Sequence, residues 1–145
     1  MGAFGTASPP FPHALMLKKN WYLFTPLFLV AIPVAIYFYY ASSMGYNTTD
    51  AMNATKYFLV SGTRYAMDYN EVNFNRLQPG MDGRQVYQIM GKQPSERLDN
   101  DSRWVYALAK PGARAYHERV VIMERDQQNV PRVKELVRRF HAPGQ

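Results

Sequence analysis

The side chains that could carry out acid–base chemistry or bind a metal are three histidines and a short acidic loop. They are His13, His117 and His141, with Asp99 and Asp101 in the sequence LDNDS. A histidine beside a carboxylate can act as a general acid–base pair, but neighbouring residues in a strand point to opposite faces, so His117 and Glu118 do not form one. Two carboxylates in a polar loop are more often a solvated turn than a site for a divalent cation.

The sequence lacks the other residue patterns that chemistry requires. It contains no cysteine, which excludes disulfides, thiolate-ligated zinc, iron–sulfur clusters, thiol catalysis and a lipid-modified cysteine. A Ser-His-Asp arrangement, a phosphate-binding glycine loop and a zinc-ligand spacing are also missing from the sequence. We therefore predict a protein that is not an enzyme, with no cofactor, no metal and no small-molecule substrate.

The formal net charge of +6 favours acidic protein partners or anionic lipid. Its distribution is mixed, because residues 76–145 hold thirteen Lys and Arg against eight Asp and Glu. A nucleic-acid-binding protein normally has a denser basic stripe on a recognisable module. We therefore predict no nucleic-acid partner.

An apolar stretch runs from Trp21 to Ala41 and has no ionisable side chain except tyrosines. A helix needs ~20 such residues to cross the ~30 Å of bilayer hydrocarbon. Aromatic residues, which favour the headgroup region, stand at both ends of the stretch. Those that we assign to the anchor are Trp21, Tyr22, Tyr37, Tyr39 and Tyr40. The stretch predicts a transmembrane helix rather than the buried helix of a soluble protein, and it is too long and too far from the N-terminus for a cleaved signal peptide.

Two prolines and a lack of charge define the character of this helix. Pro26 lies in the first turns, where the missing N–H costs little, whereas Pro33 is interior and should bend the helix. A span without His, Asp, Glu, Lys or Arg has no proton relay, ion pathway or axial ligand for haem or chlorophyll. It is therefore an anchor or a packing helix.

The charged flanks predict the orientation of the helix. Lys18 and Lys19 precede it, whereas the stretch Ser42–Thr55 that follows has no Lys or Arg. Positive residues are retained on the cytoplasmic side. We expect a bacterial inner-membrane protein with its N-terminus in the cytoplasm and its C-terminal domain in the periplasm.

Four segments follow from these patterns: an extended cytoplasmic segment (1–19), the transmembrane helix (20–42), a juxtamembrane helix with a connector (43–75) and an α+β domain (76–145). The juxtamembrane helix should be capped by Thr49 and stop at Gly62. Residues 63–79 have no sustained period and predict an extended connector. Its aromatic residues are typical of protein interfaces, and the candidate interface residues here are Tyr65, Tyr69 and Phe74.

The last segment carries the clearest local signals. Asp82 is a good N-cap for a short helix that Gly91 ends. Alternating residues at 103–109 and the run 116–125, separated by a Pro-Gly turn, predict an antiparallel hairpin. Residues 130–140 have helical spacing of apolar residues, yet they would also complete a sheet, and we expect a strand paired with 116–125. The basic residues of this segment, Arg132, Arg138 and Arg139, are candidates for an interface or for anionic headgroups, or are a solvated face.

Residues 76–140, about half of the chain, resemble the BamE/SmpA (OmlA) family of small envelope proteins. The residues that carry the resemblance follow in order along the chain: Leu77, Pro79, Gly80, Met81, Val86, Ile89, Gly91, Pro94, Trp104 and Tyr106. The resemblance implies a small α+β domain in which an antiparallel sheet of two or three strands packs on short helices. It also implies a non-catalytic, complex-stabilising role, with the apolar helix standing where the family has a lipid anchor.

Together these features predict a single-pass accessory subunit. Its helix and extracytoplasmic domain would stabilise a larger multi-subunit integral membrane protein complex, such as a photosynthetic or respiratory one, in the lipid bilayer. The alternative is an envelope or outer-membrane protein assembly factor that binds its partners transiently.

Overall fold

The structure, a computed structural model, describes residues 21–144 of the 145-residue chain. The chain divides into two compact units, Met1–Val34 and Ala35–Gln145. The predictions for the cytoplasmic segment 1–19, including those on His13, Lys18 and Lys19, lie outside the described residues.

Helix α2 (Trp21–Ser43) begins in the first unit and ends in the second. Its 23 residues correspond to ~34 Å at 1.5 Å per residue, close to the thickness of bilayer hydrocarbon. The helix continues through Pro26 and Pro33. The stretch Phe24–Ser43 is long and apolar enough to cross a membrane, although a signal sequence can have the same length and composition. The predicted apolar helix over 20–42 is therefore present, and its crossing of a membrane stays a prediction.

The aromatic residues assigned to the anchor differ in exposure. Tyr22 in the first unit is 59% exposed, and Tyr39 in the second is 53% exposed. Tyr40, however, is 4% exposed and belongs to a core cluster of the second unit, with Tyr37 packed against that cluster. The prediction that Tyr40 faces the membrane interface is therefore wrong, because the domain itself covers this side chain.

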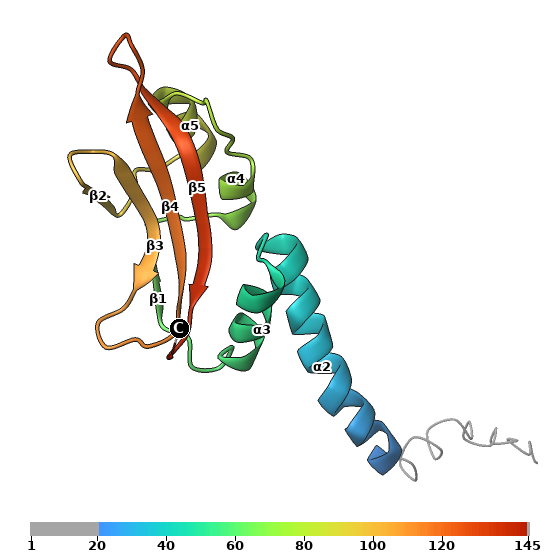
Figure 1. The fold of residues 1–145 in the computed structure, drawn as a ribbon. Coiled ribbons are helices and arrows are strands. Elements are labelled where there is room, and N and C mark those ends of the chain that lie inside the picture. Colours follow the sequence, from blue (N-terminus) through green and yellow to red (C-terminus); the bar gives the residue numbers. More distant parts are fainter. Residues whose placement is uncertain (1–20, 145) are drawn as a thin grey trace, which may run out of the picture. The chain divides into compact units, whose positions relative to one another are not determined.

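The second unit contains an antiparallel sheet of five strands (Figure 1). The strands are β1 (Thr63–Tyr65), β2 (Glu96–Leu98), β3 (Arg103–Ala109), β4 (Tyr116–Arg125) and β5 (Pro131–His141). The order is β1-β3-β4-β5, and β2 also pairs with β3. The α+β class is confirmed, as is the predicted hairpin, but the expected sheet of two or three strands is too small. The two additional strands, β1 and β2, are only three residues long and share one edge of β3.

Strand β5 resolves the ambiguity of the last segment in favour of the sheet. It pairs with β4 from Tyr116↔His141 to Arg125↔Pro131, with a register shift after Ile122 where Lys134 is the extra residue. A bulge of this kind lets two residues of one strand oppose a single residue of its partner. It therefore places Val133 and Leu136, which are three apart, against the same core cluster. The interval of three between Val133 and Leu136, which looks helical in the sequence, arises because the bulge adds one residue to the usual interval of two in a strand.

Three short helices accompany the sheet. They are α3 (Thr48–Lys56), α4 (Glu71–Asn75) and α5 (Gly83–Met90). The predicted caps of α5 are confirmed: Asp82 forms a capping box with Gln85, and Gly91 is left-handed at φ +72°. A left-handed residue is nearly free of strain only as glycine.

The segment 43–75 differs from the prediction. Asn47 rather than Thr49 caps α3, and the helix ends at Lys56 instead of continuing towards Gly62. Residues 63–79 are not an extended connector, because they contain β1 and α4. All of this segment belongs to the same compact unit as the sheet.

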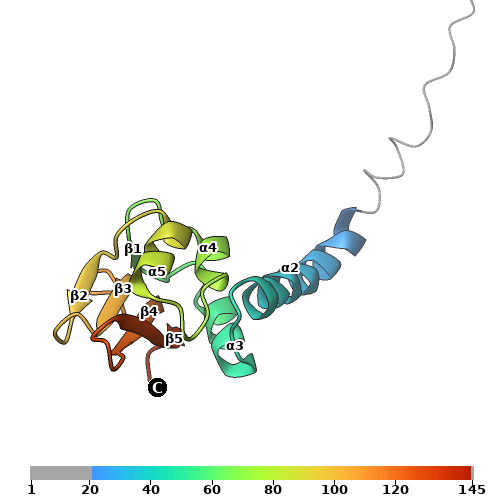
Figure 2. The same cartoon turned by 90° about the horizontal axis from the view of Figure 1, so that it is seen from above.

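Two apolar clusters hold the second unit together on the helix-covered face of the sheet (Figure 2). In the first cluster α4 and α5 pack on β3, β4 and β5; its largest members are Phe74, Val86, Trp104, Tyr106 and Val121. In the second, α3 and the end of α2 pack on the last residues of β5; it contains Tyr40, Met44, Tyr46, Ala51, Ala54, Ala115 and Phe140. The last turns of the apolar helix are thus part of the domain core.

Candidate functional site

A completely buried arginine lies between the two clusters. The Arg119 side chain on β4 has no exposed surface, and its Nε donates to Glu71 Oε1 at 2.9 Å. Glu71 is at the start of α4, and its other oxygen accepts a hydrogen bond from the Tyr69 hydroxyl at 2.7 Å. A buried charge of this kind is retained only with a partner, since desolvation would otherwise be prohibitive. The ion pair therefore joins α4 to the sheet.

The same guanidinium holds the chain where it leaves the apolar helix. Arg119 Nη1 donates to the Tyr46 hydroxyl at 2.9 Å, and Nη2 donates to the Met44 carbonyl at 3.4 Å. The central carbon of the guanidinium, Arg119 Cζ, lies 4.7 Å from the centre of the Tyr46 ring, within the range of a cation–π contact. The residues just after α2 are thus bound to the sheet by a charged group as well as by apolar packing.

His117 completes this buried polar network. Its Nδ1 lies 2.6 Å from the Tyr46 hydroxyl, and the two rings stack with an interplanar angle of 4°. The hydroxyl accepts from Arg119, and its proton can go to His117 Nδ1 or to the Arg139 carbonyl, which lies at 3.3 Å. Burial, reinforced by the positive charge of Arg119, lowers the pKa of His117 to about 4. Burial also raises the pKa of Tyr46, so the hydroxyl stays protonated.

This network predicts a stability that depends on pH. The unfolded His117 has a pKa near ~6.5, whereas the folded one is about 4, so the unfolded chain binds the proton first. With respect to His117, the free energy of unfolding is therefore highest above pH ~6.5. It falls progressively, by at most ~3 kcal/mol, as the pH falls towards ~4. His117→Gln, which retains an acceptor for Tyr46, should flatten the urea-unfolding free energy between pH ~7 and ~5. Equal slopes for both proteins would contradict the assignment.

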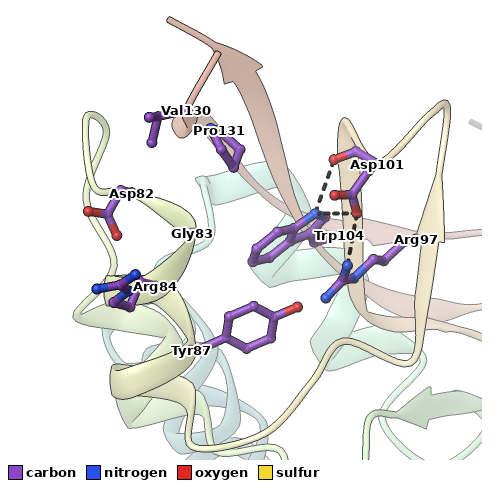
Figure 3. Close-up of a pocket in the computed structure, with 9 residues that line it drawn as sticks. All are labelled: Asp82, Gly83, Arg84, Tyr87, Arg97, Asp101, Trp104, Val130 and Pro131. Atoms are coloured by element: carbon purple, nitrogen blue, oxygen red, sulfur yellow. Dashed lines mark hydrogen bonds and ion pairs between the residues drawn. The ribbon is translucent and has the colours of Figure 1, made fainter. Parts of the chain in front are cut away.

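A cleft of about 660 Å³ opens at the end of the sheet where β5 begins (Figure 3). One wall is the start of α5, the other is the β2–β3 hairpin, and Val130 and Pro131 border it. Gly83 allows the close approach of α5, since a Cβ there would meet Trp104 Cη2 at 2.9 Å. The Trp104 indole N–H donates to the Asp101 carboxylate at 3.0 Å, which orients the ring.

The cleft combines aromatic side chains with charges of both signs, since Asp82 and Asp101 line it together with Arg84 and Arg97. The Arg97 guanidinium lies 5.0 Å from the centre of the Trp104 ring and 5.5 Å from that of Tyr87. The Tyr87 hydroxyl is buried and makes no hydrogen bond within the described part of the chain, and it points towards Arg97 (Figure 3). No ion pair among residues 21–144 involves Arg84 on the opposite wall. An acidic or carbonyl-rich segment of a protein would find donors here.

A second hollow of about 460 Å³ lies beside the buried ion pair. It is lined by Met44, Tyr65, Ala66, Asp68, Tyr69 and Glu71. The Tyr65 and Tyr69 rings stack at 5.2 Å. Met67 and Val72, which are sequence neighbours of lining residues, are 77% and 68% exposed. Exposed methionine and tyrosine are enriched at protein interfaces, so this is the second candidate contact surface.

The remaining interface candidates do not form one surface. Phe74 is completely buried in the first cluster, so its assignment to an interface is wrong. Arg138 lies over the Phe74 ring at 5.7 Å, whereas the backbone of Arg139 faces Glu118 on β4. Arg132 is at the other end of β5, where it pairs with Asp126 at 2.8 Å.

The residues of the family resemblance have mainly structural positions. Val86, Trp104 and Tyr106 lie in the first cluster, while Met81 and Ile89 pack at its margin. Four more lie between elements: Pro79 and Gly80 form a turn in which Gly80 has φ +90°, Gly91 ends α5, and Pro94 precedes β2. Leu77 is also buried in the first cluster.

The structure separates the residues considered for chemistry. Within residues 21–144 no group of three or more His, Asp or Glu side chains could hold a metal. Asp101 contacts Trp104 and Arg97, and Asp99 faces Arg103 at 3.6 Å. Glu118 contacts His141 Nε2 at 2.8 Å rather than His117.

The network around Arg119 had no sequence signal except its position in an alternating strand. Counting inward positions of β4 places Arg119 among core residues, and a charged residue at such a position needs a partner. Glu71 is 48 residues away, so only the fold identifies it. No protein-family model, curated protein or solved structure matches the chain, and the family resemblance stays a prediction from the sequence.

Proposed function

We propose that the protein is a non-catalytic, single-pass accessory subunit that stabilises a larger integral membrane protein complex, such as a photosynthetic or respiratory one. The observation that carries this proposal is the absence of a linker between the apolar helix and the domain. Helix α2 is continuous to Ser43, and Tyr40, Met44 and Tyr46 are buried in the second unit. A domain that only has to be kept near a membrane can be joined to its anchor by a flexible linker, whereas here the end of the helix is packed into the domain.

The buried ion pair supports the same proposal. The interaction of Arg119 with Glu71 and Tyr46 contributes little net stability once desolvation is counted, but it specifies one arrangement of the groups that it joins. A defined arrangement at the exit of the helix favours a lasting contact with a neighbouring subunit. The second hollow, with Tyr65 and Tyr69 beside the exposed Met67 and Val72, supplies a surface for that contact.

The proposed location is a bacterial inner membrane, with the N-terminus in the cytoplasm and the domain in the periplasm. The support is the contrast between Lys18 and Lys19 before the helix and the uncharged flank after it. Protease added outside spheroplasts should remove the domain. Cleavage only after the cytoplasmic face is opened would contradict this orientation.

Purification in mild detergent through a tag on this chain tests the proposed function. We expect a stoichiometric complex that contains pigment or haem bound to its other subunits. Met67→Asp combined with Val72→Asp should reduce the recovery of that complex, since a charge in a desolvated contact is costly. Gln127→Asp combined with Gln128→Asp, in the exposed turn between β4 and β5, adds the same charge away from the hollow and is the matched control. Recovery of the chain alone, at every detergent strength that preserves the complexes of the membrane, would contradict the proposal.

The second candidate is an envelope or outer-membrane protein assembly factor, and the cleft is the observation that favours it. The half-buried Tyr87 ring, over the buried Trp104, and the Arg84 and Arg97 donors suit an extended segment of many different proteins. Such binding would be transient and substoichiometric. Recovery of β-barrel assembly components in the same purification would support this candidate over the first.

A further inference from the structure

Three consecutive apolar residues are exposed in the tight turn after α3. Phe58, Leu59 and Val60, here called the apolar turn, are 48%, 89% and 69% exposed. The turn is ordered by its own backbone: the Val60 N–H donates to the Tyr57 carbonyl at 3.0 Å and the Phe58 N–H donates to the Thr55 carbonyl at 3.3 Å. A contiguous apolar surface that the protein leaves open marks a contact with a membrane or another protein.

The apolar turn is attached to the loop between β3 and β4. The Gly62 N–H donates to the Ala115 carbonyl at 2.8 Å, and the Lys110 N–H donates to the Gly62 carbonyl at 3.0 Å. Gly62 makes this approach possible, because a Cβ at this position would lie 2.8 Å from Ala113 Cβ. The two loops therefore form one surface.

The charges on this surface have one sign. Lys56, Lys110 and Arg114 are exposed, and no ion pair among the described residues involves them. Residues 51–67 and 102–117 contain no Asp or Glu. Exposed apolar side chains rimmed by Lys and Arg are typical of segments that lie in the interface of an anionic bilayer, where the apolar groups enter the acyl boundary and the cations meet the headgroups.

The surface also lies close to the last turns of the apolar helix, which belong to the same unit. After Ser43 the chain turns, and α3 packs on β5. Tyr57, at the end of α3, packs against the same cluster as Ile36 and Tyr37 of α2. The apolar turn therefore follows a residue that packs near the last turns of α2, the end of the stretch that could cross a membrane.

We propose that the apolar turn inserts into the interface of a bilayer with anionic headgroups, and that Lys56, Lys110 and Arg114 bind those headgroups. This inference rests on the proposed membrane crossing of α2. It gives the domain a second membrane contact besides the helix. The opposite end of the sheet, with the cleft, is then ~30 Å away along the ten residues of β4.

The absence of native cysteine allows a direct test with the full-length chain. Leu59→Cys, at a residue that is almost fully exposed, is labelled with an environment-sensitive fluorophore and reconstituted into vesicles. The vesicles contain phosphatidylcholine alone or mixed with phosphatidylglycerol. We expect a blue-shifted emission, quenched by lipids with a spin label near the headgroup, that is strongest in the mixed vesicles. Gln127→Cys, in the exposed turn between β4 and β5, should stay in water.

Charge reversal tests the role of the basic residues. Lys110→Glu combined with Arg114→Glu should abolish the difference between the two vesicle types, since each basic residue near an anionic surface contributes roughly fivefold in binding. A label at position 59 that stays in water in both vesicles, or that is buried only when partner proteins are added, would overturn the inference. Equal burial with and without phosphatidylglycerol would also overturn it.

A third label separates this inference from the proposed function. Val30→Cys, within α2, should be buried in the hydrocarbon of both vesicles if the helix spans them. Burial at position 30 with exposure at position 59 refutes the apolar turn alone. Exposure at both positions refutes the membrane crossing as well.

Discussion

Glu71→Ala is expected to lower the free energy of unfolding by ~3–5 kcal/mol, because it leaves the Arg119 guanidinium buried without its carboxylate. The whole stability of a domain of this size is ~5–15 kcal/mol, so much of the protein would be unfolded at modest denaturant concentrations. Arg119 cannot escape by losing its proton, because an arginine guanidinium is not deprotonated in proteins. Urea unfolding of the full chain in detergent, followed by circular dichroism, measures the loss.

A double-mutant comparison identifies the cause of that loss. Arg119→Met places an unbranched apolar side chain at the same buried position, so the pair Glu71→Ala and Arg119→Met removes both charges together. We expect the double variant to be more stable than Glu71→Ala alone, since apolar replacements of buried ion pairs are often neutral or stabilising. A double variant that loses the sum of the two single losses would show that the two side chains act independently.

Trp104→Ala is the second change with a large expected effect, a loss of ~3–5 kcal/mol. The ring is 2% exposed, and it packs with Tyr87 at a centroid distance of 5.0 Å and with the N-terminal turn of α5 at Gly83. Its removal leaves a cavity that this small core cannot refill without moving α5. The thermal melting temperature of the full chain, by circular dichroism, should fall by more than ten degrees, at ~4–8 °C per kcal/mol.

Trp104→Phe is the matched control, because it keeps an aromatic ring and removes the N–H that Asp101 accepts. It should lose markedly less stability than the alanine variant. An unchanged melting temperature for Trp104→Ala would mean that the side chain serves the cleft rather than the core. In that case the variant would alter partner binding only.

The features that local chemistry determines could be predicted from the sequence. The apolar helix follows from a run of residues that has no charge to place in water. Helix α5 follows from Asp82 and Gly91, whose side chain and backbone satisfy its free ends. The hairpin follows from the alternation in Arg103–Ala109 and Tyr116–Arg125 around a Pro-Gly turn, and the structure has the same bounds. In each case the deciding interactions lie within a few residues.

The candidate site could be predicted only in part. Trp104 was identifiable as a core aromatic, but the cleft beside it also needs Arg84, Arg97 and Pro131 from other elements. Tyr65 and Tyr69 line the second hollow, and their assignment to an interface stays a prediction, whereas Phe74 in α4 is buried. Burial depends on which other elements pack over a residue. The sequence of a short aromatic segment does not show which of its residues will be covered.

Tertiary contacts alone determined how the apolar helix joins the domain. Val133 and Leu136 have the spacing of a helix, yet they lie in a strand, because the segment pairs with β4 along its whole length. A bulge accommodates the extra residue between them. The buried Arg119 is hydrogen-bonded to Glu71, Tyr46 and Met44, which lie 48 or more residues away in the sequence. The helix was evident in the sequence because its apolar run is local. Its burial at Tyr40 and its attachment through a buried charge were not, because the energy of a buried group depends on the partner that the fold brings to it.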